Sequence, residues 1–212
     1  MWCRTVMALV RDGAGRPAHV TAMLEDISAR KQAEAELVHQ TLHDPLTELP
    51  NRQRFLDRLE ETRALRLAGG SGLGVVFMDL DGFKEVNDSL GHHAGDELLI
   101  AVARRLRAAV RPTDILARFA GDEFLVLADD LRSLDDLTQL AERLMACLDR
   151  PFPIAARRLR VTASIGVAHS ADAQDPAEDM LRKADAAMYL AKQRGRNRVE
   201  VFGQLQSEHA AA

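Results

Sequence analysis

The segment RFAGDEFLVL at residues 118–127 places a short turn between two apolar runs. Turn residues between stretches of β-type sequence predict a hairpin. An Asp-Glu pair has little structural role at a hairpin tip, whereas its oxygens suit a divalent cation such as Mg²⁺. The hairpin also narrows the choice of fold class. A hairpin inside an alternating series of strands and helices favours a ferredoxin-like palm over a doubly wound sheet.

Strand and helix patterns alternate from residue 44 onward. Apolar runs predict strands, and apolar residues three and four apart predict amphipathic helices. We expect helices at 51–67 (ended by Gly69-Gly70), 93–110, 134–148 and 178–193, and strands at 74–80, 124–128, 159–169 and 197–202. They predict an α+β fold of the palm or nucleotidyl cyclase type, with a central antiparallel sheet flanked by helices.

The first part of the chain has a different character. Two β-type runs at residues 5–10 and 19–24 flank a turn, which predicts a hairpin. Two strands alone are marginal in water, so they either dock on another surface or belong to a larger sheet. Residues 28–43 predict a polar helix with Ser28 as its N-cap. Its thin apolar stripe leaves open a solvated linker or a two-chain coiled coil.

Composition narrows the functional classes. The chain has 212 residues, of which 47% are hydrophobic and 28% charged, as in ordinary globular proteins. A net charge of −4 gives no electrostatic reason to expect a nucleic-acid partner. The apolar stretches are of strand length, so we expect no membrane contact within this segment. Cys3 and Cys147 lack metal-ligand spacing and predict free thiols, and with no signal-peptide pattern we expect a cytoplasmic chain.

A second carboxylate cluster follows the apolar run at 74–80. We expect Asp79 at the end of that strand, and Gly82 would free the backbone for close approach to a ligand. Asp79 and Asp122 on adjacent strands would face one cation, as needed to hold Mg²⁺ against substrate phosphates. Each cluster alone is slightly better explained as a solvated turn. Both together favour the metal site.

Two further polar stretches allow two interpretations. Residues 87–96 offer Asn and Asp side chains that can pair with a purine edge, yet alone they predict a loop with an N-cap Asp. The adjacent histidines His92 and His93 lack the spacing of a zinc site. Residues 187–197 end a helix. Lys192 and Arg196 suit phosphate binding, although capping is the better interpretation without context.

The motifs also form an ordered set. They are Asp44-Pro45-Leu46-Thr47, Asn51-Arg52, DLDGFK at 79–84, Asn87-Asp88, Gly91-His92, Gly95-Asp96, AGDEF at 120–124, SIGV at 164–167, and Ala191-Lys192 with Gly195-Arg196-Asn197. In order and spacing they resemble the GGDEF family of diguanylate cyclases, which condense two GTP into cyclic di-GMP. The resemblance covers about residues 44–202.

The resemblance implies roles at the matching positions. Mg²⁺ or Mn²⁺ would be held by the side chains of Asp79 and Asp122 and by the Leu80 carbonyl. Asp122 would also accept a proton, with Glu123 as a supporting carboxylate. The implied substrate contacts are Asn87 and Asp96 on guanine, His92 at a substrate-binding position, Phe83 and Lys84 at the triphosphate, and Lys192 and Arg196 on its outer oxygens.

The implied reaction is attack by the 3′-hydroxyl of one GTP on the α-phosphate of another. Because one domain holds one GTP, two domains must meet face to face in a homodimer. Arg111 and Asp114 match the family's RxxD product-inhibition motif. An Arg fork can bind guanine O6 and N7, and an Asp can accept from a guanine N–H.

Residues 1–27 resemble the end of a PAS domain. We therefore expect a partial PAS domain at 1–27, a signalling linker helix at 28–43, the cyclase domain at 44–203 and a disordered tail at 204–212.

The sequence departs from the family pattern in three ways. Ala120 replaces the first Gly of the signature, and its methyl would demand a negative φ or crowd the nucleotide. Glu48 replaces the Gly usual in DxLTGL. Pro50 and residues 186–189 resemble GGDEF modules that precede an EAL phosphodiesterase domain.

Ala120 is the main argument for the rival interpretation, a catalytically inactive regulatory module that binds GTP or cyclic di-GMP. A purely structural dimerisation module is disfavoured by the many ligand-type residues. A cyclase with an adenine-containing product is disfavoured because Asp96 suits guanine.

Overall fold

The computed structural model describes residues 1–67 and 71–203, except the side chains of residues 34, 35 and 38. The expected helix end at Gly69-Gly70 and the expected tail at 204–212 lie outside the described residues. The chain divides into two compact units, Met1–Thr41 and Leu42–Ala212. Within the described residues, no helix is both long and apolar enough to cross a membrane.

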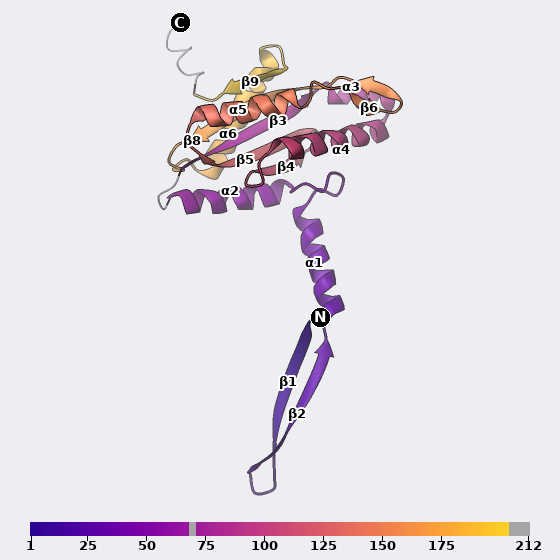
Figure 1. The fold of residues 1–212 in the computed structure, drawn as a ribbon, viewed down its shortest axis with the longest axis vertical. Coiled ribbons are helices and arrows are strands. Elements are labelled where there is room, and N and C mark those ends of the chain that lie inside the picture. The colour runs from indigo at the N-terminus through magenta and orange to yellow at the C-terminus, as the bar shows by residue number, and fades with distance from the viewer. Residues whose placement is uncertain (68–70, 204–212) are drawn as a thin grey trace. The chain divides into compact units, whose positions relative to one another are not determined.

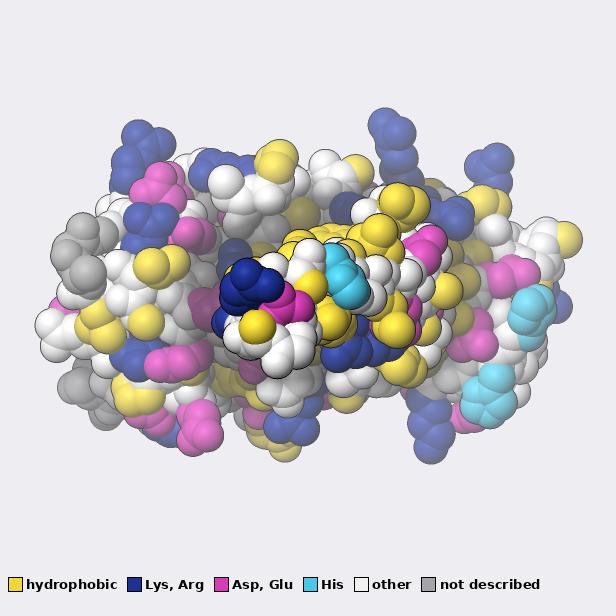
Figure 2. All heavy atoms as spheres, turned by 90° about the horizontal axis from the view of Figure 1, so that it is seen from below, with side chains coloured by type: hydrophobic (Ala, Val, Ile, Leu, Met, Phe, Trp, Pro, Cys, Tyr) yellow, Lys and Arg dark blue, Asp and Glu magenta, His cyan; other side chains and the backbone are white. Residues whose placement is uncertain are grey.

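The first unit contains the predicted hairpin (Figure 1). Strand β1 (Cys3–Arg11) pairs antiparallel with β2 (Pro17–Asp26). In the turn, the carboxylate of Asp12 accepts the backbone N–H groups of Ala14 and Arg16, both at 2.9 Å. Every residue of both strands is exposed, and Figure 2 shows the apolar side chains (yellow) that gather on the hairpin. The exposed large apolar residues of the strands are Val6, Met7, Leu9, Val10, Val20, Met23 and Leu24.

Helix α1 (Ser28–Leu42) follows the hairpin. Ser28 is its first residue, and the Ser28 hydroxyl accepts the backbone N–H of Trp2 at 2.8 Å. The carboxylate of Asp26 accepts the N–H of Ser28 at 2.9 Å. The prediction that Ser28 caps the helix was therefore wrong, because its hydroxyl binds Trp2, the residue before β1, and the N–H of Lys31 donates to the Ile27 carbonyl.

The second unit is built on a five-stranded sheet in the order β4-β5-β3-β8-β9. The strands are β3 (Gly72–Asp81), β4 (Ile115–Ala120), β5 (Glu123–Leu131), β8 (Thr162–Ser170) and β9 (Arg198–Val201). The pairs β4–β5, β5–β3 and β3–β8 are antiparallel, whereas β8 and β9 are parallel. A helical crossover between β8 and β9 permits this parallel pair. The expected α+β class is confirmed, with a mixed sheet.

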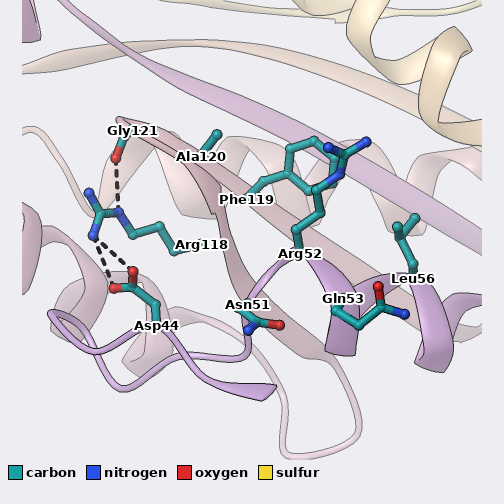
Figure 3. A pocket seen from close by; sticks show the side chains of 9 residues that line it. All are labelled: Asp44, Asn51, Arg52, Gln53, Leu56, Arg118, Phe119, Ala120 and Gly121. Carbon is teal, nitrogen blue, oxygen red and sulfur yellow. Dashed lines mark hydrogen bonds and ion pairs between the residues drawn. The ribbon is translucent and has the colours of Figure 1, made fainter. Parts of the chain in front are cut away.

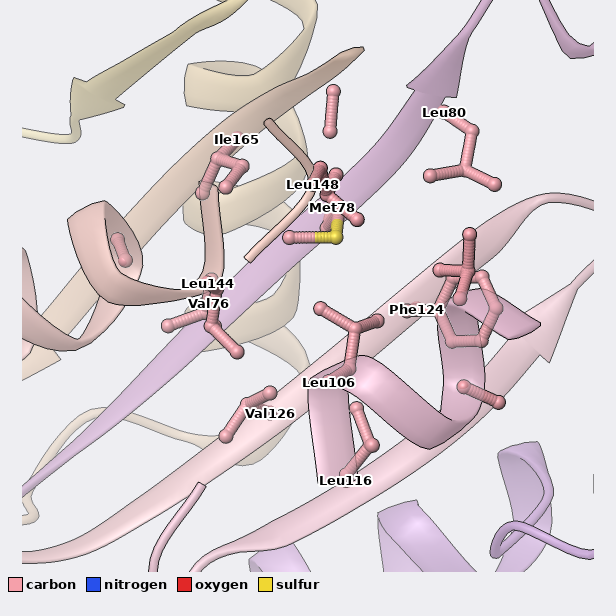
Figure 4. Packing of buried hydrophobic residues seen from close by; sticks show 14 of the residues in the cluster. Val76, Met78, Leu80, Leu106, Leu116, Phe124, Val126, Leu144, Leu148 and Ile165 are labelled. Atoms are coloured by element: carbon pink, nitrogen blue, oxygen red, sulfur yellow. The ribbon is translucent and has the colours of Figure 1, made fainter. Parts of the chain in front are cut away.

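Helices cover both faces of the sheet (Figure 1). Helices α4 (His92–Ala109) and α5 (Leu134–Ala146) pack on one face, and α2 (Arg52–Leu67) and α6 (Ala177–Gln193) pack on the other. Successive side chains of β3 alternate between the two cores. Val76 and Met78 enter the first core, shown in Figure 4, and Val75 and Phe77 enter the second. This central strand is therefore buried on both sides.

Helix α6 approaches β8 very closely at Gly166. A Cβ there would lie 2.1 Å from both the carbonyl oxygen of Ala184 and the backbone nitrogen of Met188. Only glycine allows two backbones to come so near. The glycine of the SIGV segment thus sets the distance between this helix and the sheet.

Three short elements were not predicted. They are α3 (Phe83–Leu90), β6 (Phe152–Ile154) and β7 (Arg157–Leu159). The interpretation of residues 87–96 as a loop was wrong, because they span the end of α3, a Gly91 with φ of 84°, and the start of α4. Asp96 lies inside α4 and is not its N-cap.

The turn before α2 shows why glycine, which Glu48 replaces, suits this position. The backbone N–H of Glu48 donates to the Asp44 carbonyl at 2.9 Å, and the N–H of Asp44 donates to the Leu49 carbonyl at 2.8 Å. This closed turn holds Glu48 at a φ of 58°, in the left-handed region. Glycine adopts that region without steric penalty, whereas a residue with a Cβ is strained there.

We expect Glu48→Gly to raise the free energy of unfolding by about 1 kcal/mol, because it relieves this strain. Glu48→Ala is the matched control, since it removes the exposed side chain and keeps the Cβ. Urea unfolding of the three proteins measures the effect. Equal stabilisation by Gly and Ala would show that the side chain, and not the backbone, is responsible.

Candidate active site

The carboxylates predicted for the site meet where β3 lies beside the hairpin of β4 and β5. This hairpin carries the AGDEF motif at residues 120–124 and is called the signature hairpin below. Asp79 is directly opposite Glu123 on β5 and Ser164 on β8. The backbone N–H of Leu80 donates to the Asp122 carbonyl at 3.4 Å. Asp79 lies two residues before the end of its strand and not at the end as expected, because β3 continues to Asp81. The expected adjacency of the two carboxylate-bearing strands is confirmed.

Negative charge is concentrated at this position. Burial, reinforced by the charge of Asp79, raises the pKa of Asp122. Burial also raises the pKa of Glu123, with further contributions from Asp79, Asp122 and Asp185. Like charges held close together in a partly desolvated site disfavour ionisation. The cluster therefore favours the approach of a cation.

One lysine partly offsets this charge. The Nζ of Lys192, from the last turn of α6, lies 2.7 Å from Oδ2 of Asp79, whose exposure is only 9%. The interpretation of Lys192 as a helix cap was wrong, because its ammonium group reaches across to the sheet. Arg196 lies just beyond the helix end, with a φ of 62°.

The oxygen atoms at this position provide part of the coordination that a hard divalent cation needs. Asp79, Asp122 and the Leu80 carbonyl offer oxygen ligands, which Mg²⁺ and Mn²⁺ prefer. Among the described residues, no group of three or more His, Cys, Asp or Glu side chains converges as a metal site. A cation at Asp79 and Asp122 would thus complete its coordination with phosphate oxygens or water. Mg²⁺ commonly binds in this way beside a nucleotide.

Helices α3 and α4 carry the other residues expected at the nucleotide. A Cβ at Gly95 would lie 2.0 Å from the side-chain oxygen of Asn87, so the Asn87 side chain lies directly against the first turn of α4. Phe83 is partly buried against the core. The exposed members of the set are Lys84 on α3 and His92 and Asp96 on α4. The structure therefore places these five residues on two consecutive helices.

An arginine that the sequence analysis left without a role supports the signature hairpin (Figure 3). The Nε of Arg118 donates to the Gly121 carbonyl at 2.8 Å, and its Nη1 lies 3.0 and 3.1 Å from the two carboxylate oxygens of Asp44. Asp44 also accepts the backbone N–H and the hydroxyl of Thr47. Arg118 thus ties the turn that precedes Asp122 to the start of the second unit.

Ala120 fits the backbone of the hairpin. It is the last residue of β4, pairs with Glu123, and has a negative φ. The left-handed residue of the turn is Gly121, with a φ of 51°. A methyl group at position 120 therefore introduces no backbone strain, in agreement with the first of the two expected consequences of this substitution.

Arg111 and Asp114 form a tight turn between α4 and β4. The N–H of Asp114 donates to the Arg111 carbonyl, and the Asp114 carboxylate accepts the Arg111 N–H, both at 3.0 Å. Burial raises the pKa of Asp114. The carboxylate is thus held by the backbone, while the Arg111 side chain is exposed.

Comparison with known proteins identifies the family. The family model described as "Diguanylate cyclase, GGDEF domain" matches residues 41–198, which is most of the chain. Together with the fold and the signature hairpin, this match shows that the chain belongs to the GGDEF-domain family of diguanylate cyclases. Cyclases of this family generally depend on a divalent metal.

Two curated relatives come from Pseudomonas aeruginosa. MucR, a bifunctional diguanylate cyclase/cyclic di-GMP phosphodiesterase, is 47% identical over 178 residues, which cover 84% of this chain and 25% of MucR. NbdA, a cyclic di-GMP phosphodiesterase, is 41% identical over 189 residues, which cover 87% of this chain and 23% of NbdA. The chain therefore spans about a quarter of the length of these relatives.

A solved structure supports the fold. The crystal structure of the coiled coil and GGDEF domain of DgcB from Caulobacter crescentus, in complex with c-di-GMP, matches with a TM-score of 0.77 and 26% identity. The match covers 82% of this chain and 93% of the DgcB chain.

We expect Asp122→Asn to raise the free energy of unfolding at pH 7 in metal-free buffer. A carboxyl whose folded-state pKa is raised stabilises the fold only while protonated, and this contribution is lost as the pH rises through the raised pKa. Removing the charge of Asp122 therefore raises the free energy of unfolding at pH 7 and changes it little below about pH 4. Urea unfolding at both pH values, with the exposed Asp149→Asn as control, measures the difference. Equal stability at pH 7 would contradict the electrostatic interpretation.

Proposed function

We propose that the chain is a diguanylate cyclase domain, which condenses two GTP into cyclic di-GMP and releases two diphosphates. The observation that carries the proposal is the partly desolvated carboxylate cluster of Asp79, Asp122 and Glu123 beside Lys192. Such a cluster suits a cation and the phosphates of a nucleotide. Membership of the cyclase family supports the same reaction.

Different residues would bind the base and the phosphates of GTP. Asp96 would accept the N–H groups on one side of guanine, and Asn87, held against Gly95, would bind the same base. His92 would line the base site. Phe83 and Lys84, at the start of α3, would contact the triphosphate.

The reacting centre would lie at the end of β3. Asp79, Asp122 and the Leu80 carbonyl would hold Mg²⁺ or Mn²⁺, which when bound offsets the negative charge of the reacting phosphate. Lys192 and Arg196 would bind the outer phosphate oxygens. Asp122 would accept the proton of the attacking 3′-hydroxyl, and its raised pKa makes it a better base than an ordinary carboxylate. Glu123 would support it.

Assembly would complete the site, because each domain supplies one GTP and two domains must meet face to face. We assign residues 1–27 to the end of a PAS domain, 28–43 to a signalling helix that pairs with a second chain, and 44–203 to the cyclase domain. The exposed apolar side chains of the two-stranded hairpin support the first assignment. The DgcB structure, which contains a coiled coil together with its GGDEF domain, supports the second.

A second candidate is a catalytically inactive module that binds GTP or cyclic di-GMP. One observation favours it: the relative NbdA is named a phosphodiesterase only, although 87% of this chain matches it. The backbone of Ala120, by contrast, gives the inactive module no support.

Product formation from GTP and Mg²⁺ tests the first candidate. We expect the purified protein to make cyclic di-GMP, and Asp122→Ala to lower the rate at least about 100-fold, because it removes the proton acceptor and a metal ligand. Chromatography of the nucleotides measures the product. A fusion that forces dimerisation is assayed in parallel, so that poor assembly is not mistaken for inactivity.

Two outcomes decide between the candidates. If neither form exceeds Asp122→Ala while both bind GTP, the cyclase proposal fails and the inactive module stands. If Ala120→Gly restores activity to an inactive protein, the methyl of Ala120 crowds the nucleotide.

We further propose that Arg111 and Asp114 form a product-inhibition site. The exposed Arg111 fork would bind guanine of cyclic di-GMP, beside an Asp114 carboxylate that the backbone already orients. We expect Arg111→Ala to abolish inhibition by added cyclic di-GMP, measured as the rate of diphosphate release. Arg104→Ala, on the exposed face of α4, is the matched control. Unchanged inhibition in Arg111→Ala would remove this site from the proposal.

A further inference from the structure

Asp81, the last residue of β3, accepts hydrogen bonds from three donors. Its Oδ1 accepts the Ser164 hydroxyl at 2.7 Å, and its Oδ2 accepts the Thr162 hydroxyl at 2.7 Å. Oδ2 also accepts the backbone N–H of Asn197 at 3.1 Å. Thr162 and Ser164 lie on β8, whereas Asn197 lies in the connection from α6 to β9. One carboxylate therefore joins the central strand to two other parts of the fold.

The connection from α6 to β9 has an unfavourable backbone conformation. Gly195, Arg196 and Asn197 have φ values of 109°, 62° and 47°. Residues with a Cβ remain in the left-handed region only where surrounding contacts hold them. The N–H of Arg196 donates to the Ala191 carbonyl at 2.9 Å, and the N–H of Asn197 donates to Asp81. The carboxylate of Asp81 is thus the side-chain contact that holds this conformation among the described residues.

This conformation determines where Arg196 lies. Its side chain is exposed, and no hydrogen bond or ion pair of its guanidinium occurs among the described residues. Lys192 pairs with Asp79 at 2.7 Å. Asp79 and Asp81 are two residues apart on one strand, so their side chains point to the same face. The end of β3 therefore holds Lys192 directly and Arg196 through its backbone.

We propose that Asp81 is a positioning residue that holds Arg196 beside Lys192 for the phosphate chain of the nucleotide. The proposal rests on the proposed cyclase function and assigns Asp81 no contact with substrate or metal. Arginine binds phosphate through charge-assisted hydrogen bonds that need defined geometry. A loop that already has the bound conformation loses less conformational entropy on binding.

A merely structural role of Asp81 has a different consequence. If Asp81 were only structural, loss of its contacts to Thr162 and Ser164 would lower the stability of the fold. It would then weaken the binding of GMP and of a triphosphate alike. The positioning role requires a selective loss of triphosphate affinity that depends on Arg196. The two roles can therefore be distinguished by comparing ligands with and without the outer phosphates, and by combining the Asp81 and Arg196 substitutions.

The test compares the affinities of 3′-deoxy-GTP, which lacks the attacking hydroxyl, and of GMP, which lacks the outer phosphates. We expect Asp81→Ala, which removes the acceptor of the Asn197 N–H, and Arg196→Ala each to weaken 3′-deoxy-GTP binding roughly tenfold, with GMP binding changed less than about twofold. The double variant should bind no more weakly than Arg196→Ala, because both changes remove one interaction. Thr162→Val, which keeps the contact between Asp81 and Asn197, is the control and should bind normally. Calorimetry measures all affinities.

Hydrogen exchange provides a readout without nucleotide. We expect faster exchange of the Asn197 amide in Asp81→Ala, with the amides of β3 still protected. Additive losses in the double variant, or wild-type affinity in Asp81→Ala, would overturn the positioning role alone. Failure of the wild-type protein to bind 3′-deoxy-GTP would overturn the proposed function, and this inference with it.

Discussion

The central strand β3 is the element on which the site depends. It is hydrogen-bonded to β5 and β8, and its side chains enter the cores on both faces of the sheet. A strand buried in this way must be apolar along its length, which leaves Asp79 and Asp81 at its end as the polar exceptions. A carboxylate with an exposure of 9% needs a partner, and Lys192 supplies it. The close approach of α6 at Gly166 brings that lysine within reach.

The same arrangement leaves the site with more negative than positive charge. Lys192 pairs with Asp79, and the pKa values of Asp122 and Glu123 remain raised by burial and by Asp79. A protein selected only for stability would replace one of these carboxylates. Unfavourable electrostatics concentrated at one strand end is typical of a site that binds a charged ligand. Charge, and not pocket shape, therefore makes this the candidate active site.

The sequence predicted the long elements and the signature hairpin, because each has a clear apolar period or turn. It did not predict α3, which has eight residues, or the hairpin of β6 and β7, whose strands have three residues each. Segments of this length carry too little periodicity to be recognised. The partners of Asp81 and Arg118 were also missed. Asp44 is 74 residues from Arg118, and Asn197 is 116 residues from Asp81, so only the fold brings them together.

The two departures that replace a glycine, Ala120 and Glu48, differ in their physical consequences. Ala120 replaces a glycine at a position with negative φ, and the left-handed conformation of the turn belongs to Gly121. Glu48 also replaces a glycine, but at a φ of 58°. Sequence comparison alone makes the substitution in the signature seem the more serious one. The backbone reverses that order, because Ala120 is accommodated without strain while Glu48 is strained in a turn far from the carboxylates in sequence. The case for an inactive domain therefore has to rest on contacts of the Ala120 methyl with the nucleotide, and not on distortion of the hairpin.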